Sequence, residues 1–172
     1  MKKNILTLFA ASLLCLSLAG CAASSEEKKE ETVTEESSTE DKVYKVHELA
    51  SLGDMEISVR DFKREDTLEG EESGQKPGEN QEYVVINVEL VNNDNQAVES
   101  NIQTDFMLTE NGEPALLVTD LKGLNGTLND TIGTDQKAQG DLVYIVDQDA
   151  KLTLTFKPSY GLTEKGVTFD LE

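Results

Sequence analysis

Apolar and polar side chains alternate with a period of two along most of the chain after residue 43, which is the pattern of half-buried β-strands. The clearest run is 83–91, where Val84, Ile86, Val88 and Leu90 would share one face. Six further segments show the same pattern, and an eighth strand is expected near 44–49; the six are 55–60, 106–108, 116–118, 142–146, 152–156 and 167–171. No stripe with helical spacing follows residue 43, so we expect an all-β sandwich or barrel.

Gly, Asn and Asp separate these segments and predict turns. Asn111-Gly112 is the strongest hairpin signal, and we expect the strand before it to return along 116–118. Two longer loops differ in character. Glu65–Gln81 is acidic and Gly-rich, and we expect it to be mobile, whereas Leu121–Gly133 mixes leucines with Gly and Asn. The second loop is the better candidate for a functional role, because binding residues often lie on loops.

The N-terminus has the pattern of an export signal. Lys2 and Lys3 precede a largely apolar stretch, 5–18, which is shorter than the ~20 residues that a membrane-spanning helix needs. The stretch ends in Leu18-Ala19-Gly20-Cys21, which resembles the bacterial lipobox. The lipobox implies that residues 1–20 are removed as a signal peptide and that Cys21 Sγ carries a diacylglycerol. The alternative is an ordinary secretory peptide that happens to contain a Cys.

The segment after the lipobox is predicted to be a disordered acidic tether. Residues 22–42 are rich in Glu, Ser and Thr, and Val33 is their only sizeable apolar side chain. Such a segment cannot bury enough surface to offset its conformational entropy. We therefore expect a lipidated Cys21 and tether over 21–42, followed by a folded domain over 43–172. Cys15 lies in the removed signal peptide, so the mature domain would contain no disulfide.

The charge and residue composition argue against several classes of function. The chain carries 15 Lys and Arg against 34 Asp and Glu, a net charge of −19. Phosphate binding needs clustered basic residues, so this charge argues against nucleic acid as a partner. The single histidine, His47, has no second His or Cys with which to bind a metal. We expect neither an enzyme nor a cofactor.

Two weak candidate sites remain in the loops. Leu124 and Leu128 either cap the core or contact a partner. Asp147 and Asp149 could contribute carboxylates to a weak extracellular Ca²⁺ site. The run that begins at Asn92 lacks the Gly and Glu that an EF-hand loop requires, so a polar hairpin turn is the better interpretation.

Three stretches resemble the telokin-like domain of unknown function 4352, which is found in many bacterial lipoproteins: GENQEYVVINVELVNN (78–93), DFMLTENG (105–112) and QGDLVYIV (139–146). Each motif is loose, so the resemblance depends on their order over residues 53–171. It implies an immunoglobulin-like sandwich, similar to the mycobacterial immunoprotective extracellular antigen, with no established catalytic residues. We therefore expect 43–172 to form an immunoglobulin-like antiparallel β-sandwich of about seven to eight strands without a disulfide.

The leading hypothesis is a cell-surface lipoprotein whose domain is a non-catalytic interaction or accessory module. Its partners would be the membrane, through lipidated Cys21, and an unidentified envelope or extracellular protein. The alternative is a lipoprotein that binds a small solute or an ion such as Ca²⁺, although solute-binding proteins usually close two lobes around their ligand. The acidic tether favours a lipid anchor on the extracellular face of a Gram-positive cell membrane.

Overall fold

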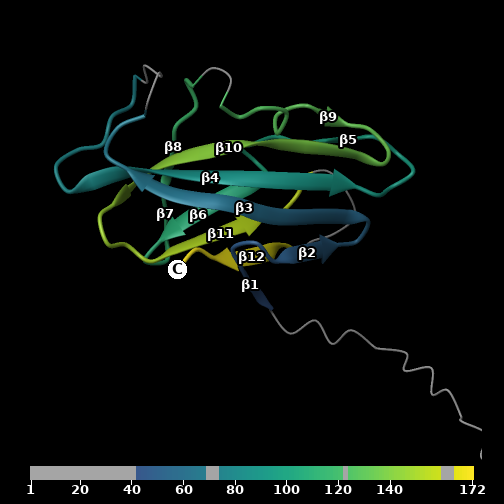
Figure 1. The fold of residues 1–172 in the computed structure, drawn as a ribbon, viewed down its shortest axis with the longest axis horizontal. Helices are drawn as coiled ribbons and strands as arrows, with labels where there is room; N and C mark the ends of the chain where they lie inside the picture. The colour runs from purple at the N-terminus through teal and green to yellow at the C-terminus, as the bar shows by residue number, and fades with distance from the viewer. Residues whose placement is uncertain (1–41, 69–73, 122–123, 160–164) are drawn as a thin grey trace, which may run out of the picture. The chain divides into compact units, whose positions relative to one another are not determined.

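The protein is described by a computed structural model covering residues 42–68, 74–121, 124–159 and 165–172. The chain divides into two compact units, Met1–Ser37 and Ser38–Glu172, and every described residue belongs to the second. Across these ranges the chain forms twelve β-strands and no helix (Figure 1). In this part of the chain there is accordingly no helix that could cross a membrane. The prediction of an all-β fold is confirmed.

The first main sheet contains both terminal strands of the domain. Its order is β1 (Val43–Lys45), β12 (Val167–Asp170), β11 (Leu152–Phe156), β6 (Phe106–Glu110) and β7 (Glu113–Pro114). Strand β1 pairs with β12 in parallel, and the other neighbours are antiparallel. The prediction of a purely antiparallel sandwich is therefore wrong at one pair. No hairpin joins β1 to β12, because they lie at opposite ends of the domain sequence, so no turn forces them to run in opposite directions.

The second main sheet is antiparallel throughout and contains the longest strands. Its order is β2 (Leu49–Leu52), β3 (Met55–Glu65), β4 (Gln81–Asn92), β10 (Gln136–Asp147) and β8 (Leu116–Leu117). Strands β3, β4 and β10 lie side by side across one layer of the sandwich (Figure 1). A small third sheet pairs β5 (Val98–Glu99) with β9 (Thr131–Ile132).

The chain changes sheet at two places where the sequence analysis expected a continuous or returning strand. The strand expected at 44–49 is divided between β1 and β2, and the turn between them holds His47 at a φ of 71°. After Asn111-Gly112 the returning strand is β7, and the chain then crosses to the second sheet, where β8 pairs with β10. These two divisions, together with the short strands β5 and β9 of the third sheet, raise the number of strands to twelve, above the seven to eight expected.

The hairpin at Asn111-Gly112 is confirmed. The two residues have φ values of 50° and 92° and join β6 to β7, where Glu110 pairs with Glu113. Two central residues with positive φ are typical of a type I′ turn, which Asn and Gly favour because they adopt this conformation at low cost.

The core lies between the two main sheets and follows the predicted alternation. Val84, Ile86, Val88 and Leu90 on β4 have no exposed surface. Facing side chains from the first sheet include Leu108, Leu154 and Phe169, which are also fully buried. Alternate residues of each long strand therefore build one continuous core, as expected for a sandwich whose outer faces meet solvent.

A second, smaller apolar cluster covers part of the outer face of the second sheet. It contains Tyr83, Val118, Leu121, Val143 and Ile145. The segment that follows β8 lies over β10 here, and the Val118 backbone N–H donates to the Val143 carbonyl at 2.9 Å. Both faces of β10 are covered, so every residue from Leu142 to Val146 is buried.

Candidate functional site

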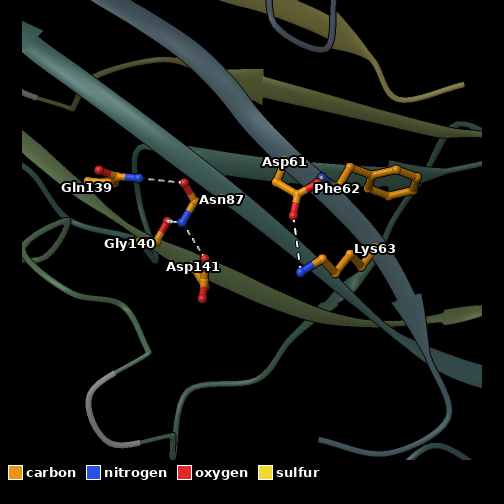
Figure 2. Close-up of polar contacts among 7 residues, drawn as sticks. All are labelled: Asp61, Phe62, Lys63, Asn87, Gln139, Gly140 and Asp141. Atoms are coloured by element: carbon orange, nitrogen blue, oxygen red, sulfur yellow. Dashed lines mark hydrogen bonds and ion pairs between the residues drawn. The ribbon is translucent and has the colours of Figure 1, made fainter.

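The uncovered part of the same outer face carries the outer-face polar strip, which we define as Asp61, Lys63, Asn87, Gln139 and Asp141 (Figure 2). The strand register places Asp61 opposite Asn87 and Asn87 opposite Asp141, so the strip crosses β3, β4 and β10. A β-bulge between Val59 and Asp61 inserts Arg60 into β3. A bulge changes the direction of the side chains that follow it, and this one comes directly before the part of β3 that carries the strip.

Asn87 is the centre of the strip's hydrogen bonds. Its Nδ2 donates to Asp141 Oδ1 at 2.5 Å and to the Gly140 carbonyl at 3.4 Å. Its Oδ1 accepts a hydrogen bond from Gln139 Nε2 at 2.8 Å (Figure 2). Both ends of the Asn87 amide are satisfied, so the amide and the carboxylate of Asp141 are held in a fixed arrangement on an accessible surface.

Asp61 and Lys63 form an ion pair at the side of the strip that β3 supplies. Lys63 Nζ lies 3.2 Å from Asp61 Oδ2, and the two side chains keep 59% and 54% of their surface exposed. The hydrogen bond from Lys63, aided by the Phe62 backbone N–H, lowers the pKa of Asp61, and the same hydrogen bond raises the pKa of Lys63. Solvent screens a pair this exposed, so it contributes little to stability.

The loop 124–128 lies directly against the free edge of β10 beside the strip. The Asp141 backbone N–H donates to the Leu124 carbonyl at 2.8 Å, and the Thr127 N–H donates to the Gln139 carbonyl at 3.0 Å. Asn125 Nδ2 also donates to the Asp141 carbonyl at 2.8 Å. These contacts pair an otherwise open strand edge with irregular chain, which is one way to protect an edge from unwanted pairing.

Two glycines permit this close approach. A Cβ on Gly140 would lie 1.9 Å from the Asn125 carbonyl oxygen, and a Cβ on Gly126 would lie 2.1 Å from the Gln139 carbonyl oxygen. This contact was not predicted from the sequence. A glycine inside a β-strand, as at Gly140, was the signal that could have predicted a close backbone crossing.

The two leucines predicted for this loop have different environments. Leu128 has no exposed surface and belongs to the main core, so it caps the sandwich. Leu124 is half-buried and packs against the second apolar cluster. Leu121 and Ile132 of the same loop are also buried. Of these four residues, Leu124 alone has exposed surface that a partner could contact, and its role in binding stays a prediction.

The predicted ion-binding carboxylates lie away from the strip, at the turn after β10. Asp147 Oδ1 accepts a hydrogen bond from Gln81 Nε2 at 3.2 Å, and Asp149 is exposed with a φ of 61°. Among the described residues, no three His, Cys, Asp or Glu side chains group closely enough to hold a metal ion. His47 is likewise exposed, in the turn between β1 and β2. The Ca²⁺ hypothesis stays a prediction.

Two buried polar residues hold the loops at the opposite end of the sandwich from Asp147. Asn92 is fully buried, and its Nδ2 donates to the carbonyls of Gln96 at 2.8 Å and Ile132 at 3.1 Å. Asp105 is 2% exposed and accepts hydrogen bonds from the Asn101 and Ser159 N–H groups at 2.9 and 2.8 Å. Neither role was predicted from the sequence. For Asn92 a signal existed, because this residue continues the inward-facing alternation of Val84 to Leu90.

Tyr144 places a hydroxyl group inside the core. The residue is 2% exposed, and its hydroxyl lies near the backbone of Leu108 but makes no hydrogen bond. Burial raises the pKa of the Tyr144 hydroxyl far above its usual range, so this group stays protonated.

The predicted lipid-attachment residues lie outside the described residues. Leu18, Ala19, Gly20 and Cys21 belong to this group, together with parts of both long loops, 69–73 and 122–123.

Several solved structures align with the chain. The candidate lipoprotein ycdA from Bacillus subtilis aligns with a TM-score of 0.61 and 21% identity, covering 72% of this chain and 38% of that chain. The yjhA protein from Bacillus subtilis aligns with a TM-score of 0.59 and 16% identity, covering 76% of this chain and 100% of that chain. A candidate lipoprotein from Staphylococcus aureus aligns with a TM-score of 0.46 and 15% identity, covering 72% of this chain and 92% of that chain.

At these identities the first two structures show a common fold, and this chain spans well under half the length of ycdA. No protein with curated annotation is significantly similar to the chain. Residues 44–167 match the family described as domain of unknown function DUF4352, a span that runs from β1 to the start of β12. The chain therefore belongs to the DUF4352 family, as the three sequence motifs indicated.

Proposed function

We propose that this protein is a lipid-anchored protein of the Gram-positive cell surface, whose β-sandwich is a non-catalytic interaction module. The anchor follows from Leu18-Ala19-Gly20-Cys21 at the end of the apolar N-terminal stretch. Support comes from the shared fold of ycdA, a candidate lipoprotein of a Gram-positive bacterium. The partner is an extracellular or envelope protein.

An immunoglobulin-like arrangement of strands supports the module role. Immunoglobulin domains have one sheet in the order A-B-E-D and a second in the order C-F-G. If β3, β4, β6, β8, β10, β11 and β12 are assigned A to G in chain order, both orders appear in this protein. Strands β1, β2 and β7 are then additions at the sheet edges. This topology is common in cell-surface domains that bind other proteins.

The observation that carries the interaction role is the outer-face polar strip. Its amide and carboxylate groups are fixed by internal hydrogen bonds yet remain accessible on a sheet face. A surface that is already ordered loses little conformational entropy when a partner binds, so more of the interaction energy contributes to affinity.

The anchor is tested with Cys21→Ser in the full chain. The thiol is the acyl acceptor, so this variant is expected to leave the membrane fraction or to remain unprocessed. A diacylglycerol supplies two acyl chains, which is enough for stable anchoring. Processing and detergent partitioning identical to those of the parent would contradict the anchor.

The interaction role is tested by photo-crosslinking on intact cells. A photoreactive residue at Gln139 samples the strip, and one at Met107, which is 48% exposed on the other sheet, is the matched control. We expect a protein adduct from position 139 alone, with a lower yield in Asn87→Ala, because the Asp141 carboxylate then loses the amide that holds it in place. Equal capture from both positions, or none from position 139, would assign the partner elsewhere.

A further inference from the structure

The chain contains two Asn-Gly dipeptides in different environments, Asn111-Gly112 and Asn125-Gly126. We propose that Asn111 is a site of spontaneous deamidation in the folded protein, and that the fold protects Asn125 from the same reaction. The modification converts the Asn111 side chain to a carboxylate and also gives isoaspartate.

The reaction needs only water and hydroxide. The Gly112 backbone nitrogen loses its proton to hydroxide and forms a bond to Asn111 Cγ. The amide nitrogen then takes a proton from water, which restores hydroxide, and leaves as ammonia when the Cγ–Nδ2 bond breaks. Water then opens the resulting succinimide at either carbonyl group, giving aspartate or isoaspartate. Glycine favours the first step because it has no side chain to obstruct the approach of its nitrogen to Cγ.

The β6–β7 turn leaves the reacting atoms of Asn111 accessible. Both Asn111 and Gly112 are exposed. Within the described part of the chain, neither the Gly112 N–H nor Asn111 Nδ2 makes a hydrogen bond, so the nucleophile and the leaving group are held by no other residue.

A backbone donor is already placed on the oxygen that gains charge. The Lys151 N–H donates to Asn111 Oδ1 at 3.2 Å, and the Asn111 N–H donates to the Lys151 carbonyl at 2.9 Å. When the nitrogen attacks Cγ, negative charge develops on Oδ1, and a fixed N–H at this position stabilises it. The two hydrogen bonds to Lys151 also hold the side chain and the backbone of Asn111 close to each other.

Asn125 lacks both advantages. Its Nδ2 donates to the Asp141 carbonyl at 2.8 Å, so departure of the amide would cost a hydrogen bond. The backbone of Gly126 is packed against β10 so closely that a Cβ there would lie 2.1 Å from the Gln139 carbonyl oxygen. Attack at Asn125 requires this segment to leave β10 first, and such local openings are rare in a paired segment.

The modification adds negative charge to an end of the sandwich that is already acidic. Glu110 and Glu113 flank the turn, and Glu110 Oε2 accepts the Asp147 N–H at 2.7 Å. Isoaspartate would also insert a methylene group into the backbone of a two-residue turn. Deamidation is therefore expected to weaken the pairing of β6 with β7.

The test is peptide mapping of the full chain by mass spectrometry after incubation at 37 °C, in the folded state and in urea. The unfolded chain supplies the intrinsic rate of each dipeptide, and the folded-to-unfolded rate ratio isolates the effect of the structure. We expect this ratio to be at least about tenfold higher for Asn111 than for Asn125, equivalent to ~1.4 kcal/mol of protection. The Asn111 product is expected to include isoaspartate and to form faster as the hydroxide concentration rises.

Asn111→Gln is the matched control, because the longer side chain keeps the amide but closes a larger ring, so conversion at this position should be lost. Equal ratios at the two sites, a higher ratio at Asn125, or no conversion of Asn111 in the folded chain would overturn the proposal. Aspartate without isoaspartate at position 111 would also overturn it, since direct hydrolysis bypasses the succinimide.

Discussion

Gly126 and Gly140 decide how closely the 124–128 loop can approach β10. The loop covers the strand edge beside the outer-face polar strip through two backbone hydrogen bonds, in which the Asp141 N–H donates to the loop and the Gln139 carbonyl accepts from it. Neither bond could form at its present length if a side chain separated the two backbones. At the scale of single residues, the absence of a Cβ is therefore as important to the site as the polar groups themselves.

Gly140→Ala is expected to destabilise the domain by about 1–3 kcal/mol, because the new methyl group overlaps the Asn125 carbonyl and forces the loop away. Chemical denaturation measures the change. Gly78→Ala is the control, since its Cβ would meet the flexible end of the Gln81 side chain at 3.2 Å, and it should change stability by less than about 0.5 kcal/mol. Equal effects of the two substitutions would contradict the close crossing.

Asn92→Ala is expected to cost about 1–3 kcal/mol, because the buried Ile132 carbonyl and the half-buried Asp94 N–H would lose the Asn92 side chain as a partner. The neighbouring Asn93 is exposed and bonds through its backbone N–H alone, so Asn93→Ala should leave the free energy of unfolding nearly unchanged. Thermal denaturation of both variants compares them directly. A similar loss of stability in both would show that the Asn92 side chain has no special role.

At the scale of elements, β1 is joined to β12 by side chains as well as by its backbone. Lys45 Nζ pairs with the Asp170 carboxylate, and the rings of Tyr44 and Phe169 lie 5.6 Å apart. The hydrogen bond from Lys45 is the main cause that lowers the pKa of Asp170 below its ordinary value of 3.8. This attachment is therefore sensitive to acid.

The lowered pKa of Asp170 predicts that the folded domain loses stability in acid. A carboxylate with a lower pKa in the folded state contributes stability above its ordinary value of 3.8 and loses it as the pH falls through the folded-state value. Asp170→Asn and Lys45→Met should each remove this acid-dependent contribution, and the double variant should lose no more than either one. Because the side chains of Lys45 and Asp170 are 56% and 34% exposed, solvent screens the pair, and the loss at neutral pH should stay below about 1 kcal/mol. Additive losses in urea denaturation would show that the two residues act independently.

The elements also show which parts of the fold the sequence could predict. Alternation identified the inner faces correctly, because burial on one side is the condition that creates a period of two. It could not predict that Val143 and Ile145 are buried as well, since their cover comes from Val118 and Leu121, which are distant in the chain. For the same reason, the crossings after β1 and β7 emerged only from the three-dimensional structure. The sequence left two roles open for Leu128, and its full burial agrees with capping of the core.

At the scale of the whole molecule, the stability of the domain depends on packing between the two sheets. Both cysteines precede residue 42, so a fragment of residues 42–172 contains none. This fragment is expected to show a β-dominated circular dichroism spectrum and a melting temperature that reducing agent does not change. A helical spectrum, or a shift in melting temperature on reduction, would contradict the sandwich.

The pairing of β1 with β12 also has a consequence for the order of folding. Lys45 and Asp170 are separated by 125 positions in the sequence, and the first sheet cannot close until both have been synthesised. Contacts of such long range slow folding, because the loop that separates them must be ordered before they form. Strand β1 is therefore expected to be among the last strands to pair, because its partner β12 is the last strand of the domain to leave the ribosome.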